Sequence, residues 1–305
     1  MNNLIAIVGP TAVGKSRLAL HLADEFNGEI VSADSRQIYR FMDIGTAKPS
    51  RQEISLIPHH LINIIKPNET FSLAQYQQLA SQAIDAIILR QRLPLLVGGS
   101  GQYVWSMVEG WGIPKVPPDF EFRHKLERRA ACGDSEGLYQ ELLMRDPKTA
   151  RRIDQHNIRR VIRALEISKA GYELPYKKPK NSAAYNVLII GLTMDRGILY
   201  RQIDSRIDNM VEQGFVKEVK GLMNMGYRLN LPALSSIGYR QIGDFLEGRT
   251  TLEAAIQQIK YESHRLVRQQ YNWFSQKDDR IKWYDVQNKV EPEIMKLVDS
   301  FIRKV

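Results

Sequence analysis

The chain contains 305 residues, of which 43% are hydrophobic and 25% are charged. This composition is typical of a globular protein and excludes a disordered, collagenous or coiled-coil chain. The formal net charge is +9, which favours a polyanionic partner. The single cysteine, Cys132, excludes an internal disulfide framework and a multi-thiolate zinc site.

The first apolar run, from Leu4 to Val8, is too short for the core of a signal peptide. No later stretch approaches the roughly 18 consecutive apolar residues that a membrane span needs. We therefore expect a cytoplasmic protein with no membrane partner. We also expect a monomer.

Apolar runs alternate with helical spacing in residues 1–112. The pattern predicts strands at 4–8, 29–33 and 93–97 and a helix at 15–26. Ser72 and Gln75 form a capping-box pattern that opens a second helix, which runs to about Arg92. Strands that alternate with helices indicate a parallel sheet covered by helices, so this segment is the first part of an α/β core.

The sequence pattern of residues 113–182 differs from that of residues 1–112. Prolines lie at both ends, and the segment between them has helical spacing and no strand pattern. We interpret this segment as an all-helical insertion. Residues 183–305 then continue the core. They are predicted to contain strands at 187–193 and 281–284, helices at 196–225, 237–247 and 252–274, and a terminal helix.

The positive charge is concentrated in the predicted insertion. Residues 145–180 hold eleven lysines or arginines against four acidic residues, a local charge of +7. Arg159 and Arg163 are four residues apart, so they share one helix face, and Arg160 adjoins them. Such a run can be an ordinary solvated face. Its concentration in one segment favours a surface that contacts a phosphate backbone.

A phosphate-binding loop follows the first strand. The run Gly9-Pro10-Thr11-Ala12-Val13-Gly14-Lys15-Ser16 fits G-x-x-x-x-G-K-[ST] at every fixed position, with a strand before it and a helix after it. Backbone N–H groups of such a loop converge on phosphate oxygens, and the helix dipole favours the anion. Lys15 supplies a positive charge and Ser16 a hydroxyl for Mg²⁺. The sequence predicts a site for diphosphate or polyphosphate.

The acidic residue that usually holds Mg²⁺ in a P-loop NTPase is missing from the expected place. The strand at 93–97 runs into Gly98-Gly99-Ser100 with no acid. Asp34 is instead the carboxylate at a strand end near the loop. It can form an Asx turn or helix cap, or it can lie beside the phosphate as a metal ligand or general base.

Several strings, in this order, resemble the tRNA dimethylallyltransferases over essentially the whole chain. They are GPTAVGKS at 9–16, DSRQIY at 34–39, MDIGTAKP at 42–49, PHHL at 58–61, LVGGSGQY at 96–103, IGYRQ at 237–241 and RQQYNW at 268–273. The resemblance implies a P-loop NTPase-like fold. It implies transfer of a dimethylallyl group from dimethylallyl diphosphate to N6 of the adenosine immediately 3′ of the tRNA anticodon. The absence of an acidic residue after the strand at 93–97 is consistent with this reaction, because no water has to be activated.

The resemblance also implies residue roles. Thr11, Lys15 and Ser16 would hold diphosphate and Mg²⁺, and Asp34 would be the general base, with Lys15 and Arg196 assisting catalysis. Ser35, Arg36 and Gln37 would line the path of the flipped adenosine. Further tRNA contacts would come from Ser100, Arg123, Arg159, Arg160, Arg163, Ser235, Ile237, Gly238, Tyr239, Arg240, Arg268, Gln270 and Trp273.

One departure from the family pattern lies in the helix after the strand at 187–193. The family has two arginines there, six residues apart, that contact the diphosphate. Arg196 matches the first, but Gln202 occupies the second position. Helical direction favours Arg206 as a replacement. We nevertheless expect Arg201 to bend round, because the family usually also has an arginine at position 206.

Two other interpretations remain open on the residues alone. A P-loop small-molecule kinase would phosphorylate its substrate with ATP but gives no role to the basic insertion. A non-catalytic RNA-binding module that uses a nucleotide as a switch gives no role to Asp34.

Overall fold

The computed structural model describes residues 2–114, 116–172 and 185–303. The chain forms two compact units, one of Met1–Val108 with Ala183–Val305 and the other of Glu109–Ser182. The sequence predicts an insertion over residues 113–182. The end of that segment, with the part of the basic stretch from residue 173 to Lys180, lies outside the described residues.

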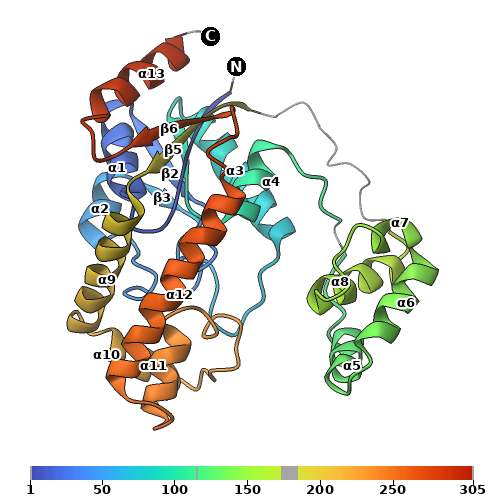
Figure 1. The fold of residues 1–305 in the computed structure, drawn as a ribbon. Coiled ribbons are helices and arrows are strands. Elements are labelled where there is room, and N and C mark those ends of the chain that lie inside the picture. The colour runs from blue at the N-terminus through green and yellow to red at the C-terminus, as the bar shows by residue number, and fades with distance from the viewer. Residues whose placement is uncertain (1, 115, 173–184, 304–305) are drawn as a thin grey trace. The chain divides into compact units, whose positions relative to one another are not determined.

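The first unit is built on one six-stranded sheet in which all strands are parallel (Figure 1). The order is β3-β2-β4-β1-β5-β6. The strands are β1 (Asn3–Val8), β2 (Gly28–Ser32), β3 (His59–His60), β4 (Leu93–Val97), β5 (Asn186–Thr193) and β6 (Ile281–Asp285). Every residue of β2 and β4 is buried, as expected of a parallel sheet with helices on both faces. The predicted α/β sheet is confirmed.

Helices connect and cover these strands. In the first unit they are α1 (Lys15–Glu25), α2 (Arg51–Leu56), α3 (Leu73–Leu89), α4 (Gly101–Val108), α9 (Arg196–Glu212), α10 (Phe215–Asn224), α11 (Tyr239–Leu246), α12 (Leu252–Trp273) and α13 (Glu291–Arg303). The predicted capping box opens α3, since Ser72 Oγ accepts from Gln75 N and Gln75 Oε1 accepts from Ser72 N. Among the described residues, no helix is long and apolar enough to cross a membrane.

The predicted single helix from Arg196 to Met225 is wrong. It is two helices, because Gly214 has φ +102°, a left-handed conformation that glycine adopts at little cost. The chain turns there, and α10 packs against both α9 and α11. The short elements α2 and β3 were not predicted, because neither is long enough to show a hydrophobic period.

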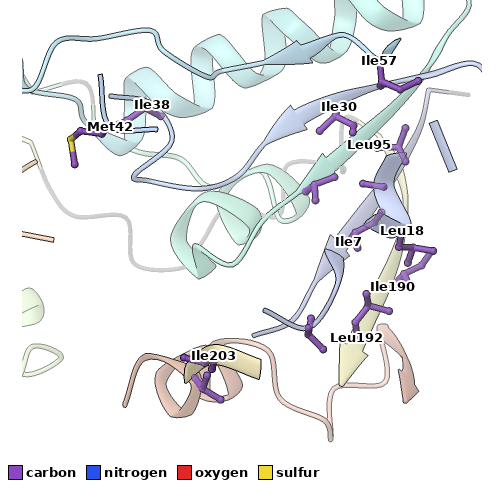
Figure 2. Close-up of a cluster of buried hydrophobic side chains, with 14 of the residues drawn as sticks. Ile7, Leu18, Ile30, Ile38, Met42, Ile57, Leu95, Ile190, Leu192 and Ile203 are labelled. Carbon is purple, nitrogen blue, oxygen red and sulfur yellow. The ribbon is translucent and has the colours of Figure 1, made fainter. Parts of the chain in front are cut away.

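The core that supports the site lies between the sheet and its helices (Figure 2). Ile7 of β1, Leu95 of β4 and Ile190 of β5 are buried there with Leu18 of α1. Burying one such side chain is worth roughly 1.5–3 kcal/mol. Ile38 and Met42 belong to the same core, each at most 1% exposed. The segment that follows β2 is therefore anchored to the sheet at two points.

The second unit contains α5 (Phe120–Ala131), α6 (Ser135–Arg145), α7 (Pro147–Ala150) and α8 (Ile158–Lys169). Its described residues form no strand, which agrees with the helical prediction. The helices bury an apolar cluster of their own that includes Leu126, Leu138, Leu142, Val161 and Leu165. This unit therefore has a separate small core.

A buried carboxylate ties α5 to α8. The side chain of Glu166 is 1% exposed and accepts hydrogen bonds from Arg123 Nε at 2.9 Å, Arg123 Nη2 at 2.8 Å and Asp119 N at 2.7 Å. Arg163 also donates to it. Burial would raise the pKa of Glu166, but the hydrogen bonds from Arg123 and Arg163 outweigh it and hold the pKa below its ordinary value.

We expect Glu166→Ala to lower the opening free energy of the helical unit by about 2 kcal/mol, because hydrogen bonds to a charged group are lost. Amides of α8 in the full-length protein should then exchange about thirtyfold faster. The stabilisation should be present above the ordinary Glu pKa of 4.5 and should disappear as the pH falls through the lower pKa of the folded state. Glu121→Ala, an exposed site on α5, is the control. Equal exchange in the two variants would contradict the prediction.

Candidate active site

The phosphate loop joins the end of β1 to the start of α1. Gly9 has φ +137°, and a Cβ there would lie 2.4 Å from the carbonyl oxygen of Leu192. Only glycine fits this approach. Helix α1 begins at Lys15, so its first N–H groups and its positive dipole end are directed at the loop.

Lys15 folds onto its own loop. Its Nζ donates to Gly9 O at 3.0 Å and to Pro10 O at 2.6 Å. Loss of hydration lowers the pKa of Lys15 to about 7. The Asp34 carboxylate partly opposes this shift, and the Arg206 charge adds to it. The charge of this ammonium group therefore changes near neutral pH.

Asp34 lies just beyond the end of β2 and faces the same space. Its Oδ1 accepts from Arg36 N at 2.8 Å, which is an Asx turn. The next residue, Ser35, donates its backbone N–H to Ser100 Oγ at 3.0 Å. The Asp34 charge is felt at Lys15 and Arg206. Asp34 is thus both a turn former and a carboxylate in electrostatic contact with the loop lysine.

A cavity of about 1030 Å³ brings these groups together. Segments far apart in the sequence line it: the phosphate loop, residues 34–37, the loop 45–49, the turn 98–103 after β4, residues 235–239, and side chains of α9 and α12. Among the predicted site residues it is lined by Thr11, Ala12, Gly14, Lys15, Ser16, Asp34, Ser35, Arg36, Gln37, Ser100, Ser235, Ile237, Gly238, Tyr239, Gln270 and Trp273.

The sequence predicts that two arginines of α9, Arg196 and Arg201, contact diphosphate. Arg196 and Arg201 are exposed, and neither is among the described residues that line the cavity. Arg196 begins the helix, about 15 Å along its axis from Arg206. Arg201 points about 100° away from Gln202, which does line the cavity.

Arg206 is the α9 arginine that lines the cavity. Loss of hydration lowers its pKa, and Asp34 only partly opposes the shift. Within the described residues Arg206 has no hydrogen-bond or ion-pair partner. The helical spacing of the sequence favours Arg206 as the replacement for the arginine that is missing at Gln202. A guanidinium beside the phosphate loop that has no ion-pair partner among the described residues favours an anionic ligand.

Gln270, predicted to contact tRNA, instead braces the phosphate loop. It is 7% exposed. Its Oε1 accepts from Thr11 N at 2.8 Å and its Nε2 donates to Gly99 O at 3.2 Å. Both polar atoms are therefore engaged inside the protein, and α12 fixes the loop to the turn after β4.

Other predicted tRNA contacts divide into two groups. Arg240 and Arg268 are exposed and lie outside the cavity lining, as far as the described residues show. In the helical unit, Arg159 and Arg160 are exposed at the start of α8, whereas Arg123 and Arg163 are bonded to Glu166. The last two have a structural role that the spacing of the sequence did not reveal.

No described group of three or more His, Cys, Asp or Glu side chains is arranged to hold a metal ion. Ser16 and Asp34 are among the oxygen-bearing side chains that line the cavity, together with Thr11 and Ser100. Mg²⁺ commonly uses one or two protein ligands together with phosphate oxygens and water. This donor set is compatible with a Mg²⁺ ion that arrives with a diphosphate.

The parallel sheet and the loop between β1 and α1 define a protein with a P-loop NTPase-like fold. A model of the IPP transferase family matches residues 37–277. The chain is 47% identical to a tRNA dimethylallyltransferase of Dehalococcoides mccartyi over 300 residues, which are 98% of this chain and 92% of the relative. It is 49% identical to that of Roseiflexus castenholzii over 272 residues, 89% of each chain.

Solved structures give the same result. A tRNA isopentenylpyrophosphate transferase of Bacillus halodurans matches with a TM-score of 0.74 and 40% identity, over 100% of this chain and 98% of that one. A eukaryotic dimethylallyltransferase acting on tRNA matches with a TM-score of 0.84 and 26% identity, over 100% of this chain and 80% of that one. The chain belongs to the IPP transferase family and is an enzyme.

The lowered pKa of Lys15 predicts a pH-dependent anion affinity. A bound anion favours the charged ammonium, so above about pH 7 binding must take up a proton. Affinity for inorganic diphosphate should then fall as the pH rises, by at most about tenfold per pH unit. Titration calorimetry at pH 6 and 8, in two buffers of different ionisation heat, measures this uptake.

Lys15→Arg is the matched control, because a guanidinium stays charged over this range. The variant should lack the extra proton uptake at pH 8, while the titration of diphosphate itself is common to both proteins. Identical uptake by the wild type and the variant would show that Lys15 is already fully charged in the free protein.

Proposed function

We propose that this enzyme transfers a dimethylallyl group from dimethylallyl diphosphate to N6 of the adenosine immediately 3′ of the anticodon in tRNA, and releases diphosphate. The observation that carries the proposal is the Asp34 carboxylate in one cavity with Lys15 and Arg206. A proton acceptor and a diphosphate cradle thus share one space. The names of the relatives support the same reaction.

The phosphate loop would stabilise the leaving group, diphosphate. As the bond from the allylic carbon to the diphosphate oxygen breaks, negative charge grows on that oxygen. Lys15, Arg206 and the N–H groups at the start of α1 are positioned to stabilise it. Donors fixed in advance at a developing charge contribute the largest single effect in many enzymes.

The acceptor side is assigned to Asp34. An adenine amine is a weak nucleophile, because its lone pair is delocalised into the ring. As the bond from N6 to the allylic carbon forms, one N6 proton passes to the Asp34 carboxylate. Ser35, Gln37 and Ser100 line the adjoining wall. An adenosine stacked in an anticodon loop must be turned out of the stack to reach them.

Mg²⁺ is part of the proposal. Ser16 would supply a hydroxyl ligand, and Asp34 is a carboxylate of the cavity lining whose charge acts on Lys15 of the phosphate loop. When bound, the ion would neutralise charge on the diphosphate. The turn after β4, Gly98-Gly99-Ser100, contains no acid, which suits a reaction in which no water is activated.

One experiment separates this function from a small-molecule kinase and from a nucleotide switch. The purified protein is incubated with Mg²⁺, unmodified tRNA and radiolabelled dimethylallyl diphosphate, and in parallel with ATP. We expect label in the tRNA and no significant ATP hydrolysis with or without tRNA. Robust ATP hydrolysis with no label in the tRNA would replace the proposal.

Asp34→Asn tests the general base. The amide keeps an oxygen that can accept from Arg36 N, so the turn at 2.8 Å is retained while basicity is lost. We expect the single-turnover rate to fall at least about 100-fold and tRNA affinity to stay within a few-fold. Asp24→Asn, an exposed site on α1, is the control. A rate above about a tenth of wild type would remove Asp34 from this role.

The exposed basic residues of the helical unit are proposed to contact the anticodon stem through its phosphates. Arg159 and Arg160 are the best candidates, because they are exposed at the start of α8. Their charges can release counterions from RNA when they bind. Arg163 is excluded from the test, because its loss would also disturb the Glu166 contacts.

Replacing Arg159 and Arg160 by Gln should reduce the steepness of log K against log salt by about 1.4 to 1.8, or 0.7 to 0.9 for each lost phosphate contact. All substrate tRNAs should be weakened alike, because phosphate contacts carry no base information. Filter binding over a salt series measures the slope. The pair Lys282→Gln and Lys289→Gln, exposed sites in the first unit, removes the same charge. An unchanged slope in the Arg159 and Arg160 variant would show that these two residues lie on a solvated helix face that does not contact RNA.

A further inference from the structure

Glu218 of α10 gathers hydrogen bonds from two separate parts of the chain. Its Oε2 accepts from Asp43 N at 2.8 Å and from Ile44 N at 2.7 Å. Its Oε1 accepts from Gly45 N at 3.2 Å and from Tyr239 OH at 2.6 Å. One carboxylate thus binds three consecutive backbone N–H groups and the phenol that begins α11. Glu218 itself is not among the described residues that line the cavity.

Tight packing accompanies this carboxylate. A Cβ on Gly45 would lie 2.3 Å from Phe215 Cε2 and 2.6 Å from Tyr239 Cε2. The rings of Phe215 and Tyr239 meet edge to face, 5.0 Å apart. The loop 43–47 therefore lies directly against α10 and α11, and only a residue without a side chain fits at Gly45.

The other side of the loop is held by Lys48. Its side chain is 4% exposed, and its Nζ donates to Tyr39 O at 2.5 Å, Asp43 Oδ1 at 2.7 Å and Asn63 Oδ1 at 2.6 Å. A buried lysine and the carboxylate of Glu218 thus hold the loop together, and both contact Asp43. Ala47 lies within it at φ +45°, a conformation that needs support from its surroundings.

The loop reaches the reaction space through Gln37. The Nε2 of Gln37 donates to Thr46 O and Ala47 O, each at 3.3 Å, and its Oε1 accepts from Ser32 Oγ at 3.0 Å. These contacts fix the orientation of the Gln37 amide, with Nε2 toward the loop and Oε1 toward Ser32. Gln37 lines the cavity together with Asp34, which precedes it by three residues in the sequence.

We propose that Glu218 is a positioning residue for prenyl transfer. It fixes the loop 43–47, the loop fixes the Gln37 amide, and that amide places the acceptor base against Asp34. Glu218 does not touch substrate. The inference rests on the proposed function and adds a determinant of acceptor placement at the same site. Among the described residues, Glu218 makes no hydrogen bond to the phosphate loop or to Arg206, which form the proposed diphosphate cradle.

The charge of Glu218 is essential to this arrangement. All four of its partners are donors. A glutamine has the same size but turns an NH₂ group toward some of these donors, so Glu218→Gln should loosen the loop without leaving a hole. Glu218→Asp keeps the charge on a shorter stem and should restore part of the lost activity.

A double-mutant cycle with Gln37→Ala tests the route of action. Alone, Glu218→Gln should lower kcat/KM for tRNA by about 10- to 100-fold, the scale expected when a reacting group is misplaced by about 1 Å. Dimethylallyl diphosphate affinity, measured without tRNA, should stay within about twofold of wild type. In the Gln37→Ala background, Glu218→Gln should cost less than about threefold more, because the two residues act in one chain. Glu212→Gln, exposed at the end of α9, is the control.

The outcomes are distinct. Additive losses in the cycle would overturn the inference, because Glu218 would then not act through Gln37. A parallel loss of diphosphate affinity would also overturn it, since that indicates a general structural role. A wild-type protein that transfers no prenyl group would overturn the proposed function and this inference together, whereas an active wild type with a silent Glu218→Gln overturns the inference alone.

Discussion

The register of the parallel sheet is the constraint on which the site depends. Ser32 of β2 and Ile7 of β1 both pair with Val97 of β4, so these strands end level with one another. Parallel strands also place their carboxyl ends at one edge, where open α/β sheets bind ligands. The phosphate loop, Asp34 and the turn after β4 therefore meet although about 90 residues separate them. A Cβ on Gly98 would lie 2.1 Å from Ala33 O, which shows how closely the last two segments approach.

At that edge of the sheet, the carboxylate of Asp34 both forms a turn and faces two cations. Asp34 lies in the field of Lys15 and Arg206, and both cations have a pKa lowered by loss of hydration. Two poorly hydrated cations beside one carboxylate leave a net positive charge among these three groups, which favours an anion. Electrostatic interactions are stronger where water is scarce, so the same loss of hydration that destabilises the charged form of Lys15 would strengthen its contact with a bound anion.

The sequence predicted what depends on local pattern and missed what depends on tertiary contacts. The phosphate loop, the buried strands and the α3 cap follow from spacing alone and are present. Helical direction favoured Arg206, but the contacts of Gln270 and Glu218 could not be predicted, because a helical period gives the direction of a side chain but not its partner. Gln270 appears as a polar residue in a basic stretch until Thr11, more than 250 residues away, is seen to donate to it. The break at Gly214 was missed because the apolar period continues on both sides.

The same limitation applies to the basic charge of the helical unit. A count of arginines treats Arg123, Arg163 and Arg159 alike, yet the first two share one buried carboxylate and the third is exposed. An arginine whose charge is already neutralised by Glu166 releases few counterions from RNA, since its guanidinium would have to abandon an existing ion pair. The local charge of +7 already subtracts Glu166, so it is the number of arginines that overstates the groups available to a polyanion. Arg163 is bonded to Glu166, whereas Arg159 and Arg160 are exposed and can carry part of the salt dependence of binding.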